Sequence, residues 1–312
     1  MSTTQRFCAR ESLALGDPLA GSAAHAERNL LLSWPRPKWQ RSLRQASDMC
    51  DEVSTRLEAI AGGGRRVNLI HRRDQSSARH RLYLMPENRR YEVARDELPA
   101  FLAALQRDEP LAYWEMAAPT GALLLCCTHG KKDKCCAKFG YTAYKALNAA
   151  VVERGLPFEV WESTHLGGCR LAASAVVFPA LRKYGRIGDE DVLPLLESEM
   201  AGRPYLPCYR GDSRLSPMQQ CAQVAALEWL ASQGIHADVS VSQPSAEQES
   251  SQGWIEMDWR DASDTGRLAV RCEPRMIQRY DTCADLAAGP PAASQVWVAT
   301  QVLATGKAVL HS

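Results

Sequence analysis

Hydrophobic patterning predicts alternating strands and helices in the first part of the chain. Residues 30–34 form a short apolar run that two prolines close, which is typical of a strand. Residues 42–61 carry apolar side chains at helical spacing and end at three glycines, so they predict a helix. Two alternating segments, 67–71 and 81–84, predict strands, and residues 97–105 predict a second helix. This β-α-β-β-α order requires a hydrophobic core of its own.

The middle of the chain has a second and different order of elements. They are a strand at 123–125, a helix at 141–154, a strand at 158–162, a hairpin with strands at 175–178 and 184–187, and a helix that begins at the acidic residues 189–191. A short helical segment follows the second strand. The order β-α-β-(short α)-β-β-α is that of a thioredoxin-like domain.

The last hundred residues begin with a capping box. Ser216 is the predicted N-cap, Pro217 takes the first helical position and Gln219 lies three residues after the cap, which predicts a helix to about residue 232. Alternating segments at 236–242, 253–259, 267–272 and 296–302 then predict strands. The Ser-, Gln- and Glu-rich residues 242–252 predict a surface loop between two of them.

These patterns together predict a mixed α/β fold in three parts. We expect an N-terminal α/β unit at 1–117, a thioredoxin-like ferredoxin domain at 118–214, and a C-terminal helix with strands at 215–312, for which the N-terminal unit is one candidate packing partner. A length of 312 residues is compatible with more than one domain.

Composition and charge narrow the classes of function. The chain is 46% hydrophobic and 23% charged, which is typical of a soluble globular protein. A net charge of +1 gives no general attraction to nucleic acid or to an anionic membrane, so neither is expected as a partner. The chain has neither a signal-peptide core nor an apolar run of about 18 residues, so we expect a cytoplasmic protein.

The distribution of the 11 cysteines along the chain indicates a functional site. Five of them fall in one short region: Cys126, Cys127, Cys135, Cys136 and Cys169. The other six are scattered and are interpreted as small hydrophobic or incidental thiols: Cys8, Cys50, Cys208, Cys221, Cys272 and Cys283. Four of the five, all except Cys126, lie in two glycine-bearing loops, at 127–136 and 163–169, each directly after a predicted strand. Because the carboxyl ends of neighbouring parallel strands meet at one sheet edge, both loops can contribute to a single site.

Thiolates and imidazole are ligands for iron–sulfur clusters and for zinc. We expect Gly130 and the pair Gly167 and Gly168 to let the backbone pass close to an inorganic centre. The cysteine spacing lacks the Cys-x₂₋₄-Cys pattern of most structural zinc sites, and it lacks the Cys-x-x-Cys of dithiol enzymes. A zinc-stabilised adaptor and a thioredoxin-fold thiol oxidoreductase remain the alternatives to an iron–sulfur protein.

The chain resembles the sucrase/ferredoxin-like family, whose core is similar to the thioredoxin-like 2Fe–2S ferredoxins. The resemblance lies in the segments CTHGKKDKCCAKFG, WESTHLGGCRLAAS and RGDSRLSPMQQ. It implies that a 2Fe–2S cluster is held by a Cys-x₈-Cys loop and a His-x₃-His motif, which here correspond to Cys127, Cys136, His165 and residue 169. Cys169 stands where the motif has its second histidine. Cys135 and His129 are the alternate ligands, with His129 favoured as a group that supports the site.

The resemblance implies single-electron transfer or redox sensing, which favours an electron carrier over a stand-alone enzyme. If the chain is an enzyme, it is expected to be an oxidoreductase. We found no paired carboxylates in a context that supports glycoside hydrolysis. The sequence also lacks a Gly-x-Gly-x-x-Gly fingerprint, so a separate redox partner protein, a reductase or an acceptor, is implied. Four lysines around the first loop are expected to steer an acidic partner: Lys131, Lys132, Lys134 and Lys138.

Overall fold

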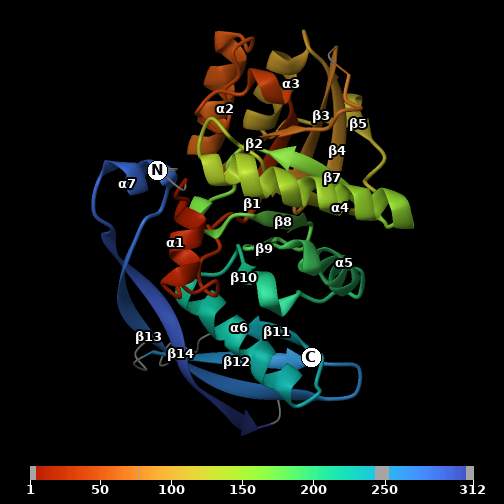
Figure 1. The fold of residues 1–312 in the computed structure, drawn as a ribbon. Coiled ribbons are helices and arrows are strands. Elements are labelled where there is room, and N and C mark those ends of the chain that lie inside the picture. Colours follow the sequence, from red (N-terminus) through yellow and green to blue (C-terminus); the bar gives the residue numbers. More distant parts are fainter. Residues whose placement is uncertain (1–4, 77, 243–252, 307–312) are drawn as a thin grey trace.

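The computed structural model describes residues 5–76, 78–242 and 253–306, and it has a mixed α/β fold with two sheets (Figure 1). The larger sheet has ten strands in the order β10-β9-β8-β6-β7-β2-β1-β3-β4-β5, and the smaller has four in the order β11-β12-β13-β14. The predicted mixed α/β class is therefore confirmed.

The first half of the large sheet is built by β1 (Arg28–Ser33), β2 (Arg65–His71), β3 (Arg79–Met85) and β4 (Arg89–Ala94). β1 is parallel to β2 and antiparallel to β3, and β3 is antiparallel to β4. Two helices, α2 (Asp51–Gly62) and α3 (Leu98–Gln106), bury their apolar faces in one core with these strands. The two-residue strand β5 (Glu115–Met116) ends the sheet on this side.

The second half repeats this topology. Its elements are β6 (Ala122–Cys127), α4 (Tyr141–Arg154), β7 (Phe158–Ser163), β8 (Ala175–Phe178), β9 (Arg182–Tyr184), α5 (Val192–Met200) and an edge strand β10 (Tyr209–Asp212). β6 is parallel to β7 and antiparallel to β8, and β8 is antiparallel to β9. This is the thioredoxin-like order predicted from the sequence. The same strand order, 2-1-3-4, in the first half was not predicted.

The two halves join where β2 meets β7. These strands are antiparallel and pair through two positions, Ile70 with Ser163 and His71 with Glu162. Both pairs lie at the carboxyl ends of their strands. The loops that follow the parallel strands of both halves therefore meet in the middle of the large sheet.

The C-terminal part covers one end of the molecule and sends an arm back along it. Helix α6 (Pro217–Ser232) packs on β11 (Asp238–Val241), β12 (Trp254–Arg260), β13 (Thr265–Arg279) and β14 (Ala292–Gly306). β13 and β14 stay paired beyond the end of β12 and carry the short helix α7 (Cys283–Ala288) at their tip. Figure 1 shows α7 beside the N-terminal end of the described chain, next to α1 (Cys8–Ala14).

Several predicted elements differ from the structure. The helix expected from residue 42 begins at Asp51, because residues 39–46 close a bridge between Trp39 and Ala46 instead. The carbonyl of Leu43 in this loop accepts hydrogen bonds from Leu69 N and Thr164 Oγ1, which fastens the loop to the sheet. The strands β4, β5 and β10 and the helices α1 and α7 were not predicted. The capping box at Ser216 is confirmed.

The predicted surface loop at 242–252 and the predicted domain boundaries are not tested by the described residues. Positions 243–252 of the predicted surface loop lie outside the described residues. The division of the chain after residues 117 and 214 stays a prediction, while the large sheet takes strands from both sides of the first boundary.

Candidate metal centre

The two predicted loops meet at one end of the parallel pair β6 and β7. Cys127, the last residue of β6, is in register with Ser163, the last residue of β7. His165 Nδ1 lies 3.9 Å from Cys127 Sγ and 3.4 Å from Cys169 Sγ. Cys136 Sγ lies 3.9 Å from Cys169 Sγ. The structure thus brings together all four side chains that the sequence predicts as ligands, with the thiols buried and the imidazole partly exposed.

A widened helical turn positions the first loop. Residues Cys136–Gly140 form a π-helical turn that continues directly into α4, a feature that often accompanies functional sites. A Cβ atom at Gly140 would lie 1.9 Å from the Cys127 carbonyl oxygen. Only glycine therefore lets this turn approach the end of β6 and bring Cys136 beside Cys127.

The second loop depends on a left-handed glycine. Gly168 has φ +80°, and a Cβ atom there would lie 2.8 Å from Arg210 Nη2. A Cβ atom at Gly167, which has φ +97°, would lie 2.9 Å from the Ala24 Cβ. The sequence favours an inorganic centre as the reason for these glycines, whereas the structure places protein atoms against both. The loop then turns into the short 3₁₀ helix Cys169–Leu171, which presents the Cys169 thiol.

The alternate ligands face other partners. His129 Nε2 lies 2.6 Å from the Gln40 carbonyl oxygen and donates to it, which leaves Nδ1 to accept the backbone N–H of His165. Burial lowers the pKa of His129, which agrees with this neutral form. The Cys135 thiol turns toward Cys8 and Cys283 instead of Cys127. The ligand set itself stays a prediction.

The pKa values of the four side chains favour proton sharing among them. The hydrogen bond from Cys136 holds the pKa of Cys127 well below its usual value, against the effect of burial. The same donor lowers the pKa of Cys169 to about 7. Burial alone would lower the pKa of His165, but the Cys127 and Cys169 thiols raise it to about 9. Thiolates at Cys127 and Cys169 are the form that binds a metal.

Two cations, Arg66 and Arg210, act on Cys127, and a third, Lys183, lies beside them, all without a carboxylate partner. Arg66 Nη2 donates to the His165 carbonyl oxygen (2.8 Å), and Arg210 Nη1 donates to that of Gly167 (3.1 Å). Lys183 Nζ donates to the Ala24 carbonyl oxygen (2.5 Å). Arg210 and Lys183 are buried, and burial lowers the pKa of all three groups. Among the described residues, none of the three forms an ion pair.

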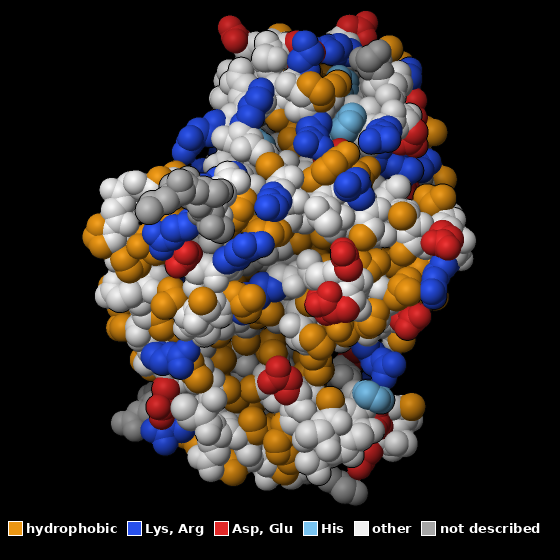
Figure 2. All heavy atoms as spheres, viewed as in Figure 1, with side chains coloured by type: hydrophobic (Ala, Val, Ile, Leu, Met, Phe, Trp, Pro, Cys, Tyr) orange, Lys and Arg blue, Asp and Glu red, His pale blue; other side chains and the backbone are white. Residues whose placement is uncertain are grey.

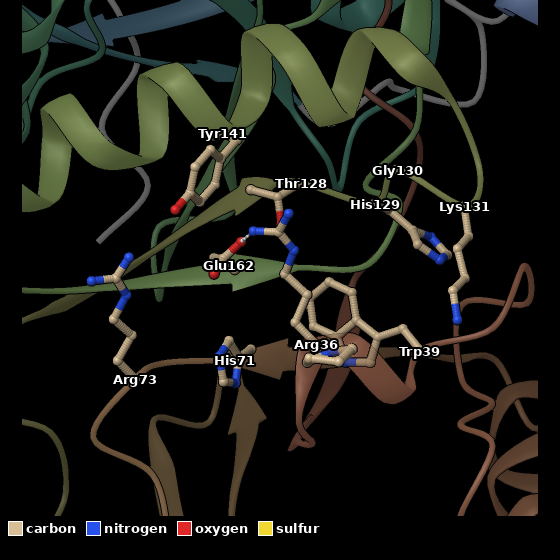
Figure 3. Close-up of a pocket in the computed structure, with 11 residues that line it drawn as sticks. Arg36, Trp39, His71, Arg73, Thr128, His129, Gly130, Lys131, Tyr141 and Glu162 are labelled. Carbon is tan, nitrogen blue, oxygen red and sulfur yellow. Dashed lines mark hydrogen bonds and ion pairs between the residues drawn. The ribbon is translucent and has the colours of Figure 1, made fainter.

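A pocket of about 520 Å³ lies on the other side of His129 (Figure 3). It is lined by the loops that follow β1, β2 and β6, and by the start of α4. Its cations are Arg36, Arg73 and Lys131, whereas its one acid, Glu162, pairs with Arg36 at 2.5 Å. The pocket wall is therefore cationic overall, and it includes His129, whose ring accepts the backbone N–H of His165.

The similarity to known proteins follows the same part of the chain. The model of one family, described as sucrase/ferredoxin-like, matches residues 19–211 and so spans both halves of the large sheet. The chain belongs to the sucrase/ferredoxin-like family. In the part of the chain that the structure describes, no helix has the length and apolar character that crossing a membrane requires.

This family member is also similar to individual proteins over shorter segments. It is 28% identical over 96 residues to altered inheritance of mitochondria protein 32 of Debaryomyces hansenii, a match that covers 29% of the chain and 35% of that relative. The chain thus spans about a third of the length of the relative. Among solved structures, the wild-type thioredoxin-like [2Fe-2S] ferredoxin of Aquifex aeolicus is 16% identical, with a TM-score of 0.26 over 28% of this chain and 95% of the ferredoxin. A cysteine-to-serine variant of that ferredoxin gives the same TM-score at 15% identity, over 28% of this chain and 96% of the variant.

Sequence reasoning missed two groups of residues near the site. The cations Arg66, Lys183 and Arg210 belong to three different strands, and nothing local marks them out. Cys8 and Cys283 were interpreted as incidental thiols, yet both reach Cys135. Only tertiary structure brings these side chains to the cysteine loop.

Proposed function

We propose that this protein carries single electrons through a 2Fe–2S cluster held by Cys127, Cys136, His165 and Cys169. The observation that carries the proposal is the convergence of three buried thiols and one imidazole from two successive strand ends, each within 3.9 Å of another member of the set. Thiolate with imidazole is an established donor set for such clusters. When bound, the cluster would take up and release one electron, and its one imidazole would raise the potential above that of an all-cysteine centre.

The three unpaired cations support an anionic occupant. A buried guanidinium or ammonium group without a carboxylate costs several kcal/mol of desolvation in an apolar interior. A cluster ligated by three thiolates would carry net negative charge, which offsets that cost. Arg66 and Arg210 also hold the second loop by its carbonyl oxygens, so their charge and their hydrogen bonds act on the same segment.

The cationic pocket supports exchange of electrons with a separate, acidic protein. His165 is the partly exposed member of the set, and His129 joins its backbone to the pocket wall. On the face shown in Figure 2, Lys and Arg side chains are spread over the upper half of the molecule. Lys131, Lys134 and Lys138 of the first loop are exposed. A surface of this kind attracts an acidic partner and speeds its association at low salt.

Anaerobic purification of the full chain tests this function. We expect a coloured protein whose visible absorption bleaches with dithionite and whose iron and acid-labile sulfide are present in equal amounts. Cys127→Ser and Cys169→Ser should lose the colour. Cys126→Ser is the matched control, because this neighbouring thiol is buried in a different core on the opposite face of β6. A colourless protein that holds one zinc through Cys127 and Cys169 would refute the proposal.

A further inference from the structure

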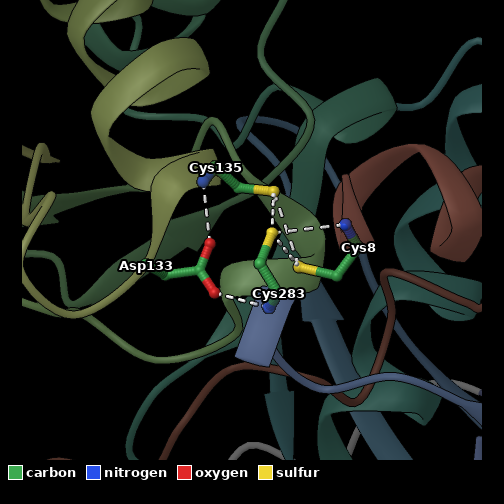
Figure 4. Close-up of side chains that lie close together, drawn as sticks. All are labelled: Cys8, Asp133, Cys135 and Cys283. Carbon is green, nitrogen blue, oxygen red and sulfur yellow. Dashed lines mark hydrogen bonds between the residues drawn. The ribbon is translucent and has the colours of Figure 1, made fainter. Parts of the chain in front are cut away.

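Three thiols from distant parts of the chain meet beside the first loop (Figure 4). Cys135 Sγ lies 3.1 Å from Cys283 Sγ and 3.5 Å from Cys8 Sγ, and Cys8 and Cys283 are also 3.5 Å apart. All three side chains are buried. Figure 4 shows the three sulfur atoms pointing toward one another from α1, the first loop and α7.

A buried carboxylate completes this group. Asp133 is 4% exposed, and one of its oxygens lies within 4.8 Å of all three sulfur atoms. Its Oδ1 accepts the backbone N–H of Cys135 and its Oδ2 that of Cys283, both at 2.7 Å. No described Lys, Arg or His forms an ion pair with it. A buried carboxylate next to three thiols is costly unless a cation lies among them.

The spacing of the sulfur atoms suits a metal ion better than a disulfide. Thiolates bound to tetrahedral zinc at about 2.3 Å lie roughly 3.7 Å apart. Sulfur atoms in a disulfide are about 2.05 Å apart. The separations of 3.1 to 3.5 Å are nearer the first value at every pair. Three sulfurs and one carboxylate oxygen also make the four-donor set of a closed zinc site.

Burial opposes the thiolate form at Cys283, whereas one backbone N–H favours it. The backbone N–H of Cys8 points at Cys283 Sγ (3.5 Å). Burial raises the pKa of Cys283 to about 12, and a divalent cation removes such protons when it binds to the thiol.

We propose that Cys8, Asp133, Cys135 and Cys283 form a second metal site, which takes a zinc-class divalent cation in a structural role. It shares no residue with the four proposed cluster ligands, although its Asp133 also lies within 4.8 Å of Cys136 and Cys169. Cys8 and Cys283 lie outside residues 19–211, which the family model matches. Binding would fasten the N-terminal helix and the C-terminal arm to the first loop. The site would therefore give the arm, formed by the far ends of β13 and β14 with α7, a structural role: it holds α7 against the first loop.

The test measures zinc bound per chain in single variants of the full-length protein, purified without oxygen and titrated with zinc against a chromophoric chelator. We expect one tightly bound zinc in the wild type. Cys8→Ser and Cys283→Ser should weaken zinc binding by more than about 100-fold, since loss of a direct ligand exceeds the usual effect of a supporting residue. Cys127→Ser and the buried-thiol control Cys208→Ser should keep the zinc.

The variants separate this proposal from the cluster proposal. Zinc lost with Cys127→Ser but kept in Cys8→Ser and Cys283→Ser would overturn the second site and locate the ion in the first. Cys283→His, which retains a zinc ligand, should keep the ion even if Cys283→Ser misfolds. Zinc-free protein with a Cys135–Cys283 disulfide, detected as linked peptides after digestion, would also overturn the proposal.

Discussion

His129 and His165 are joined by a hydrogen bond in which the backbone N–H of His165 donates to His129 Nδ1 (3.3 Å). The other nitrogen of His129 donates to Gln40, so the ring fixes the second loop against the loop after β1. His129 therefore positions the His165 backbone, and a substitution at His129 can test this role.

His129→Ala should keep the visible spectrum of the cluster but release iron to a chelator several-fold faster. The reason is that His165 would lose the bond that orders its backbone, at a cost on the order of 1 kcal/mol. Stopped-flow absorbance in the presence of a chelator gives the rate. His25→Ala, at an exposed position, is the control. A changed spectrum in His129→Ala would instead make His129 a ligand.

Arg66→Met should lower the midpoint potential by tens of millivolts, on the order expected when a nearby charge is removed. Reduction adds negative charge, and without the cation that charge is less well stabilised. Arg66→Lys should lower the potential less. Arg65→Met is the matched control, because Arg65 pairs with Glu87. Equal potentials in Arg66→Met and wild type, measured by potentiometric titration, would show that the positive charge of Arg66 does not act on the cluster.

Retention of the cluster should weaken as the pH falls from 9 to 6. With a pKa of about 9, His165 binds a proton below that pH, and Cys169, with a pKa of about 7, does so below pH 7. Ligation requires neutral imidazole and thiolate, so protons compete increasingly at lower pH. Rates of iron release at fixed ionic strength give the dependence. A rate that is flat over this range would contradict the assigned protonation states.

Gly140→Ala should destabilise the fold by about 3 kcal/mol, because its Cβ would collide with the Cys127 carbonyl oxygen at 1.9 Å. Gly62→Ala, where a Cβ meets nothing within 4 Å, should change the free energy of unfolding by less than about 1 kcal/mol. Denaturant unfolding of both variants makes the comparison. Equal stability would mean that the turn before α4 can relax away from β6.

Local patterns predicted most of the elements and the meeting of the two loops. The apolar run that ends at Cys127 and the helix that stops at Gly155 are encoded within a few residues. Because the carboxyl ends of neighbouring parallel strands lie at the same sheet edge, the loops at 127–136 and 163–169 are expected to meet there. The pairing of β2 with β7 was out of reach, since two residue pairs leave no pattern in the sequence. The group around Cys135 was equally hidden, because its partners are 127 and 148 residues away.

The long arm also sets an order of events during synthesis. The four side chains of the first site leave the ribosome within one short stretch, whereas Cys283 is made 148 residues after Cys135. Before Cys283 is synthesised, the group contains only the thiols of Cys8 and Cys135. A nascent chain that has reached residue 169 therefore holds all four side chains of the first site, whereas the group around Cys135 is complete only after residue 283 has been added.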